Sequence, residues 1–278
     1  MTQIDKSRFE WIGSDSARRE GISRPSTTFW KDAIGRLMKN KVAVVCFFII
    51  VLLILSCIIV PFFSPFESRE QHLGEVNKGF MTVCTDSRYE GQHHVHYFGT
   101  DNLGRDLFLR AFEGGRVSLM IAFAAVFVNL IVGLIYGGIS GYIGGAVDTI
   151  MMRIVEIVNG IPYLIVVILL MMVLPKGIFT MVVAYGITGW TGMARLVRGQ
   201  VLQLKSQEYI VAAEAMGAKS SRIIAKHLIP NALSVIIINV TLAIPSAIFT
   251  EAFLSYIGLG VPVPQPSWGV LAKGGQDV

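Results

Sequence analysis

The sequence predicts an all-α membrane fold, a polytopic bundle of helices that cross a lipid bilayer. Only 15% of the 278 residues are charged and 53% are hydrophobic, whereas a soluble domain carries about 25% charged residues. The apolar residues are gathered in five charge-free blocks: 42–63, 117–147, 157–175, 177–194 and 228–250. Because a spanning helix needs roughly 20 apolar residues, we expect five spans, which no soluble core of this size could bury.

The residues before the first block are expected to lie outside the bilayer core. Residues 1–28 are polar, and from Phe29 apolar side chains recur at helical spacing with charged residues on the opposite face. This pattern is typical of an amphipathic helix in the lipid headgroup region. We interpret residues 1–41 as a tail that carries this interfacial helix, the alternative being an ordinary helix packed on the rest of the chain.

Lysine and arginine are unevenly distributed among the connecting segments. Nine of the 24 precede residue 42 and six lie within 195–226, whereas residues 64–116 hold six bases and eight acids. By the positive-inside rule, the N-terminus and the 195–231 loop are predicted to be cytoplasmic. Since the bases form no single face, we expect no nucleic-acid partner. The resulting division is a cytoplasmic tail (1–41), a first span (42–63), a periplasmic segment (64–116) and a membrane core (117–278).

Four glycines stand at a spacing of four residues in and after the second block: Gly133, Gly137, Gly141 and Gly145. On a helix they form a smooth stripe, which lets another helix backbone approach closely. Packing against a helix of the same chain is the first expectation. Contact with a second membrane subunit is the alternative.

Side chains suited to catalysis are few, and we expect no enzyme. A phosphate loop needs Gly followed by Lys, and that pair does not occur in the sequence. His93, His94 and His96 lack a Cys or carboxylate at a persuasive spacing, so we expect solvated surface and assign no metal site. Glu156 and Glu251 lie near block ends, where a hydrogen-bonded structural role and a transport role both remain open.

The polar loop before the last block predicts a helix–turn–helix. Ser206 is expected to cap a first short helix over 207–216. Gly217 is expected to end that helix, because glycine adopts a left-handed backbone freely. Ser220 is expected to cap a second short helix, and Pro230 to close it. The alanines of the first helix would let the loop sink into the groove of a partner.

This loop, residues 206–231, resembles the EAA loop of ABC importer permeases. The family pattern is Glu-Ala-Ala, three residues, Gly, nine residues, then Ile-x-Leu-Pro. The positions of this chain that fall on the loop pattern are Val211, Ala212, Ala213, Glu214, Gly217, His227, Ile229 and Pro230. Val211 stands where the pattern has Glu, His227 where it has Ile, and Ile229 where it has Leu.

A second resemblance lies in the periplasmic segment. His96, Phe98 and the residues after them are similar to the H-x-FGTD-x-x-GRD signature of the oligopeptide/dipeptide permease subfamily, most closely to its C-type permeases. The signature residues here are Gly99, Thr100, Asp101, Gly104, Arg105 and Asp106. We expect a structural role for them, with Asp101 capping a helix and Asp106 paired with Arg110 one turn later.

The resemblance implies a bundle of the type I ABC importer permease kind in the bacterial inner (cytoplasmic) membrane. It further implies a heterodimer with a second permease, two cytoplasmic ATPases that use ATP and Mg²⁺, and an external peptide-binding protein. Oligopeptides or dipeptides would cross by alternating access, and this chain would bind no cofactor itself. Relatives have six spans, so a sixth is missing here. A nickel or other small-solute importer remains open, as does an ATP-independent carrier or channel.

Overall fold

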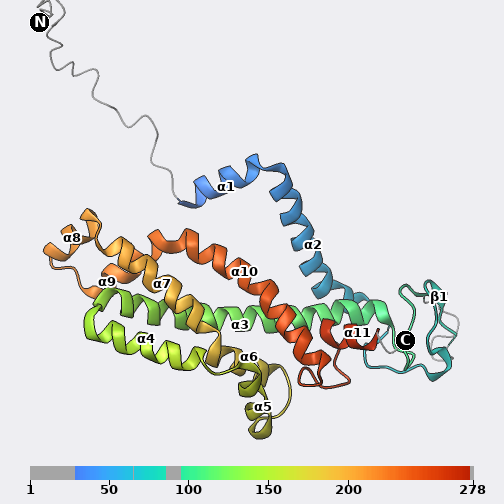
Figure 1. Cartoon of the computed structure of the whole chain (residues 1–278). Coiled ribbons are helices and arrows are strands. Elements are labelled where there is room, and N and C mark those ends of the chain that lie inside the picture. The colour runs from blue at the N-terminus through green and yellow to red at the C-terminus, as the bar shows by residue number, and fades with distance from the viewer. Residues whose placement is uncertain (1–28, 65, 86–94, 276–278) are drawn as a thin grey trace, which may run out of the picture. The chain divides into compact units, whose positions relative to one another are not determined.

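The computed structural model describes residues 29–64, 66–85 and 95–275, and Figure 1 shows the order of their elements. Within the chain, two compact units are distinguished, Met1–Leu53 and Ile54–Val278. The boundary between them falls inside the second helix.

The described part of the first unit is helical. It contains α1 (Phe29–Lys39) and the first half of α2 (Lys41–Phe63). Asn40 separates the two helices, and its side chain accepts a hydrogen bond from the first turn of α2 at 3.2 Å. The apolar side chains of Ile34 and Met38 on α1 are exposed, as an interfacial helix would require.

The second unit is built mainly of helices around α3. Its elements after α2 are η3 (Leu73–Glu75), β1 (Thr82–Val83), β2 (Val95–His96), α3 (Leu107–Ile143), α4 (Gly145–Asn159), α5 (Tyr163–Val173), α6 (Ile178–Thr188), α7 (Trp190–Lys205), α8 (Glu208–Ala215), α9 (Ser220–Ile223), η5 (Ile224–Leu228), α10 (Ile229–Tyr256) and α11 (Trp268–Gly274). The two strands pair antiparallel. Helices α4, α6, α7, α10 and α11 all contact α3 (Figure 1).

The membrane class is confirmed, but the span count differs from the five expected. In the described part of the chain, α2, α3 and the continuous segment Ser220–Tyr256 are long and apolar enough to cross a membrane. α4 and α5 add a fourth candidate, bent by 76° at the break between them. The 177–194 block is divided at Gly189 between α6 and α7. A Cβ at Gly189 would overlap the side-chain nitrogen of Asn129 and lie 2.8 Å from the carbonyl oxygen of Tyr185, so only glycine fits at this point.

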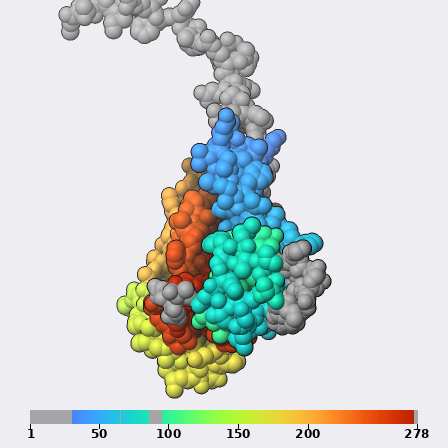
Figure 2. Space-filling view, turned by 90° about the vertical axis from the view of Figure 1, so that its right-hand side faces the viewer, coloured from blue at the N-terminus to red at the C-terminus, as the bar shows by residue number. Residues whose placement is uncertain are grey.

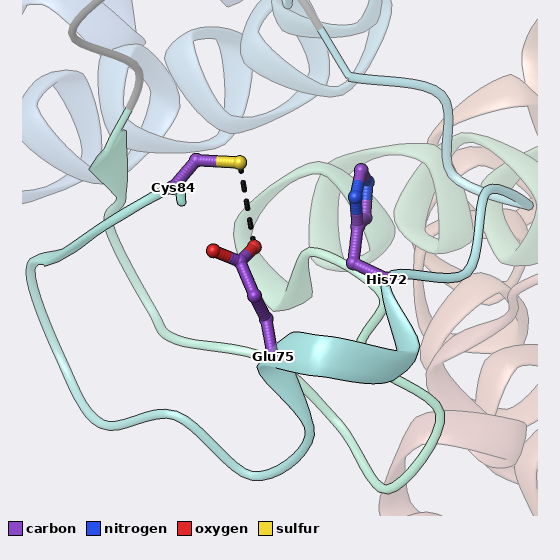
Figure 3. Close-up of side chains that lie close together, drawn as sticks. All are labelled: His72, Glu75 and Cys84. Atoms are coloured by element: carbon purple, nitrogen blue, oxygen red, sulfur yellow. Dashed lines mark hydrogen bonds between the residues drawn. The ribbon is translucent and has the colours of Figure 1, made fainter. Parts of the chain in front are cut away.

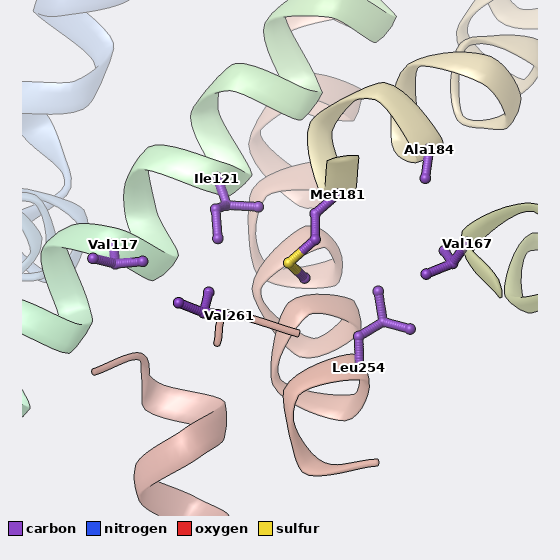
Figure 4. Close-up of a cluster of buried hydrophobic side chains, with 7 residues drawn as sticks. All are labelled: Val117, Ile121, Val167, Met181, Ala184, Leu254 and Val261. Carbon is purple, nitrogen blue, oxygen red and sulfur yellow. The ribbon is translucent and has the colours of Figure 1, made fainter. Parts of the chain in front are cut away.

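A buried apolar cluster joins α3, α5, α6 and α10, as Figure 4 shows. Its members are Val117, Ile121, Val167, Met181, Ala184, Leu254 and Val261. Figure 2 shows the described part of the 64–116 segment as a compact mass beside the C-terminal residues. Phe98 from the 64–116 segment and Leu271 from α11 line one pocket of about 770 Å³, so the two regions are in contact.

Candidate functional site: the coupling loop and its supports

The predicted helix–turn–helix over residues 206–231 is confirmed. Gly217 follows α8 and has φ of +79°. The N–H of Gly217 donates to the carbonyl oxygen of Glu214 at 2.9 Å, and the N–H of Ala218 donates to that of Ala213 at 3.1 Å. This pair of bonds is the Schellman arrangement, which needs the left-handed backbone that glycine adopts without strain.

The predicted cap residues, Ser206 and Ser220, and the predicted end of the second helix at Pro230 are wrong. Gln207 precedes α8 as its cap residue, and Ser206 instead donates its hydroxyl to the carbonyl oxygen of Gln203. Ser220 is the first residue of α9, not its cap. Pro230 does not close the second helix, because α9 continues through η5, a π-helical turn, into α10. Pro230 has no N–H to donate. The π turn just before it shifts the backbone hydrogen bonds by one residue, so the helix continues past the proline.

Buried side chains hold the loop on α7. Ile210 of α8, Ile223 of α9 and Leu228 of η5 are fully buried. They pack in one cluster with Val197 and Val201 of α7. Burying a side chain of this size stabilises the fold by about 1.5–3 kcal/mol. The loop is therefore a firmly packed part of the bundle.

The end of α3 holds the loop through polar contacts. Tyr142 donates its hydroxyl to a carboxylate oxygen of Glu214 at 3.0 Å. Lys205 donates to the carbonyl oxygen of Tyr142 at 2.5 Å, and its ammonium lies 5.1 Å from the centre of the Tyr142 ring. Glu214 thus connects α8 to α3, a contact that the sequence did not predict.

Three large apolar side chains of the loop are exposed among charged and polar ones. Tyr209, Val211 and Met216 have exposed fractions of 44%, 54% and 83%, and we call these three residues the loop surface. Tyr209 and Met216 also line a groove of about 500 Å³, together with Lys226 and His227. Of the remaining pattern positions, Ala213 is buried, Ile229 is half-buried, and the others are exposed: Ala212, Glu214, Gly217 and Pro230.

Three of the four spaced glycines lie where α3 meets α7. A Cβ on Gly137 would overlap the carbonyl oxygen of Ala194, and a Cβ on Gly133 or Gly141 would also crowd α7. The stripe expectation is wrong for Gly145, because α3 ends before it. Gly145 has φ of +59°, and a Cβ there would meet no described atom within 4 Å. It is the first residue of α4, directly after the turn at Gly144.

An ion pair joins α4 to α7 beside this contact. Arg198 donates from two guanidinium nitrogens to the two carboxylate oxygens of Asp148, each at 2.5 Å. Ser140 of α3 donates to the same carboxylate. Paired bonds of this kind are among the strongest polar contacts in proteins. In sequence they are only two charges beside predicted spans, so their pairing was not predicted.

The Gly-Thr-Asp and Gly-Arg-Asp residues shape the chain before α3. Gly99 and Gly104 have φ of +75° and +71°, and a Cβ on either would overlap a backbone carbonyl group. Thr100 accepts a hydrogen bond from the N–H of Lys78 at 2.9 Å and donates to the carbonyl oxygen of Glu75. These residues therefore pack two stretches of backbone closely together.

The two aspartates of the motif have exchanged their expected roles. Asp106 caps α3, accepting from the N–H of Leu109 at 2.7 Å, so its expected pairing with Arg110 is wrong. Asp101 accepts from Arg105 at 2.7 Å, and Nε of Arg110 lies 3.7 Å from Asp101. The reason is register, because α3 begins at residue 107 and its cap position falls on the later aspartate.

The expectation of solvated surface is wrong for His96, whereas His93 and His94 lie outside the described residues. His96 is fully buried. Its Nδ1 lies 2.7 Å from Asp106 and its Nε2 lies 3.1 Å from Glu75. Burial alone lowers the pKa of this imidazole, but hydrogen bonds and the charges of the two carboxylates raise the pKa overall.

The two block-end glutamates differ in their surroundings. Glu251 is buried and accepts hydrogen bonds from the hydroxyls of Ser118 and Ser255, each at 2.7 Å. The bond from Ser118 joins α3 to α10, which favours the structural interpretation. Glu156 is exposed and forms an ion pair with Arg153 at 2.5 Å.

Sequence comparison places these features in one class of membrane protein. Residues 130–276 match the family described as binding-protein-dependent transport system inner membrane component. Residues 28–79 match the N-terminal TM domain of oligopeptide transport permease C. The chain belongs to this family of inner-membrane transport components.

Individual relatives narrow the assignment. The oligopeptide transport system permease protein OppC of Bacillus subtilis (strain 168) is 48% identical over 99% of this chain and 86% of that protein. The dipeptide transport system permease protein DppC of the same organism is 47% identical over 92% of this chain and 76% of that protein. The chain is therefore a permease of the oligopeptide/dipeptide subfamily, as the resemblance predicted.

A more distant similarity exists among solved structures. A chain from inward-facing conformations of the MetNI methionine ABC transporter is 22% identical, with a TM-score of 0.49. The similarity covers 56% of this chain and 77% of that chain. A similarity of this degree does not bear on function.

Proposed function

We propose that this chain and a second permease form the path by which oligopeptides or dipeptides enter the cell by alternating access. Two cytoplasmic ATPases would drive the cycle and an external binding protein would deliver the peptide. ATP and Mg²⁺ would be used by the ATPases, because this chain lacks the Gly-Lys pair of a phosphate loop. The peptide substrate is suggested by the relatives, which are named for oligopeptide and dipeptide transport.

The loop surface is the observation that carries this proposal. Tyr209 and Val211 are exposed on α8 and Met216 directly follows it, while Ile210 of the same helix packs on α7. Aromatic residues and methionine are enriched where proteins contact one another. A firmly held apolar surface on the predicted cytoplasmic side suits the docking of an ATPase, and a carrier that works without ATP would not need it.

A charge in the loop surface is expected to release the ATPases. Met216→Asp would force a carboxylate into an apolar contact, at a cost of several kcal/mol, and each 1.4 kcal/mol weakens binding about tenfold. We expect ATPase co-purification and peptide uptake to fall at least about tenfold, with an unchanged membrane level. Gln203→Asp, at an exposed position of α7, is the matched control and is expected to behave as wild type.

The same assay separates the alternatives. Normal ATPase association and uptake in Met216→Asp would contradict the docking assignment. Uptake driven by an ion gradient in vesicles without ATPases would indicate a secondary carrier. Competition by nickel, but not by peptides, would indicate a small-solute importer of the same family.

The predicted topology is tested by thiol labelling. Arg69→Cys and Ser220→Cys place cysteines at exposed positions of the periplasmic segment and the coupling loop. In intact cells, an impermeant thiol reagent is expected to label the first variant above the wild-type background and to leave the second at that background. Equal labelling of the two variants from outside would refute the orientation derived from the positive charges.

A further inference from the structure

The periplasmic segment holds a group of side chains that the transport proposal does not use. His72, Glu75 and Cys84 lie close together, and Figure 3 shows the sulfur of Cys84 directed toward the carboxylate of Glu75 with the ring of His72 nearby. One nitrogen, oxygen or sulfur atom of each lies within 4.8 Å of those of the other two. All three residues are buried, with exposed fractions of 2%, 3% and 8%.

The local fold explains why these three residues meet. His72 precedes the short helix η3, and Glu75 ends it. Cys84 directly follows β1, which pairs with β2. Gly104 allows close approach to the carbonyl of His72, and Thr100 donates to the carbonyl oxygen of Glu75. The Gly-Thr-Asp and Gly-Arg-Asp residues therefore hold the backbone at His72 and Glu75 in place.

The spacing and chemistry of the group fit a zinc ion. Sγ of Cys84 lies 3.3 Å from Oε2 of Glu75. In a tetrahedral zinc site with Zn–S of about 2.3 Å and Zn–O of about 2.0–2.2 Å, neighbouring sulfur and oxygen ligands lie about 3.5 Å apart. A mixed set of imidazole, thiolate and carboxylate suits zinc, whereas Mg²⁺ and Ca²⁺ prefer oxygen ligands alone.

The surroundings also favour a bound cation. One carboxylate oxygen of Glu75, Oε1, accepts hydrogen bonds from the N–H and the hydroxyl of Thr85, while Oε2 faces Cys84 and His96. A divalent ion that displaces the proton of the Cys84 thiol would stabilise the buried carboxylate and the thiolate that forms beside it. His96 contacts Glu75 with one ring nitrogen and Asp106 with the other. Such chains of carboxylate and imidazole commonly orient the ligands of a metal ion.

We propose that His72, Glu75 and Cys84 bind a zinc ion in the periplasmic segment, with a water molecule as the fourth ligand. The ion would tie η3 to the end of β1, and so hold together the region that leads into α3. The expectation of no metal site was based on His93, His94 and His96. None of the proposed ligands is among these three histidines.

The test uses the full chain in detergent, purified through a tag without histidine after growth with added zinc. Elemental analysis is expected to find one zinc ion per chain. After replacement of zinc by Co²⁺, a thiolate-to-cobalt absorption band is expected. In Cys84→Ser, zinc content should fall roughly tenfold or more and the band should disappear. Cys46→Ser, which removes an exposed thiol of α2, should retain both signals.

Thermal unfolding separates loss of the ion from loss of the fold. A serine at 84 keeps a hydroxyl that can donate to Glu75, so the variant is expected to fold. A chelator should lower the Tm of the wild type and added zinc should restore it, whereas the Tm of Cys84→Ser should respond to neither. If Cys84→Ser aggregates, the change in the Tm of the wild type on adding a chelator and then zinc tests the site by itself. Wild-type protein without zinc and without a chelator response would refute the site, as would an unchanged cobalt band in Cys84→Ser.

Discussion

Gly137→Ala is expected to stop the chain from accumulating as a folded membrane protein. The added Cβ would overlap the carbonyl oxygen of Ala194 and lie 2.9 Å from Cβ of Val197. Because the obstacle is backbone, the helices α3 and α7 must separate to relieve it. Overpacking of this kind typically costs about 1–3 kcal/mol, and separation would also strain the nearby pair of Asp148 and Arg198. Gly137→Leu, with a larger side chain, should lower the amount of folded protein further.

The matched control is Gly192→Ala on α7. A Cβ at Gly192 would meet no atom of the described chain within 4 Å, and alanine favours a helix by about 1 kcal/mol over glycine. We expect Gly192→Ala to accumulate and unfold like wild type or slightly better. Membrane level and thermal unfolding in detergent measure both variants. If Gly137→Ala matched the control in both, the close contact of α3 and α7 would not be needed.

Gly217→Asp is expected to reduce peptide uptake to background while the membrane level stays unchanged. A Cβ at this glycine would meet nothing within 4 Å among the described atoms. Its φ of +79° lies in the left-handed region, which costs most residues about 1–2 kcal/mol but is more accessible to Asp and Asn. The fold should therefore persist, and the new charge would stand beside the loop surface, where an ATPase is proposed to dock.

Gly217→Asn separates charge from shape. Asparagine has nearly the size of aspartate and the same tolerance of a left-handed backbone, so this variant should retain most of the uptake and ATPase association. Equal loss in the two variants would assign the effect to shape. Normal uptake and ATPase association in Gly217→Asp, at an equal membrane level, would contradict the coupling role of this turn.

Features that depend on short stretches of sequence were predicted well. Long apolar blocks follow directly from the need to cover hydrocarbon, so the all-α membrane class could be predicted and is confirmed. The turn at Gly217 follows from the backbone freedom of one residue. The division of the 177–194 block at Gly189 could not be predicted, because it depends on close packing that includes Asn129 of α3.

The site was predicted less completely because its contacts join distant residues. The helix–turn–helix of the loop was expected, but the bond from Tyr142 to Glu214 spans 72 residues. The interchange of Asp101 and Asp106 depends on where α3 begins, and a shift of a few residues changes which aspartate is the cap. His72 and Cys84 come together only through the η3 turn and the pairing of β1 with β2.

The π-helical turn η5 has a mechanical consequence. Through it, the loop continues without interruption into α10, as one helical segment from Ser220 to Tyr256. α10 alone has 28 residues and is therefore about 42 Å long. Glu251, near its far end, is bonded to Ser118 of α3. A displacement of the loop would therefore be carried along this continuous helix toward the hydrogen bond that joins α10 to α3.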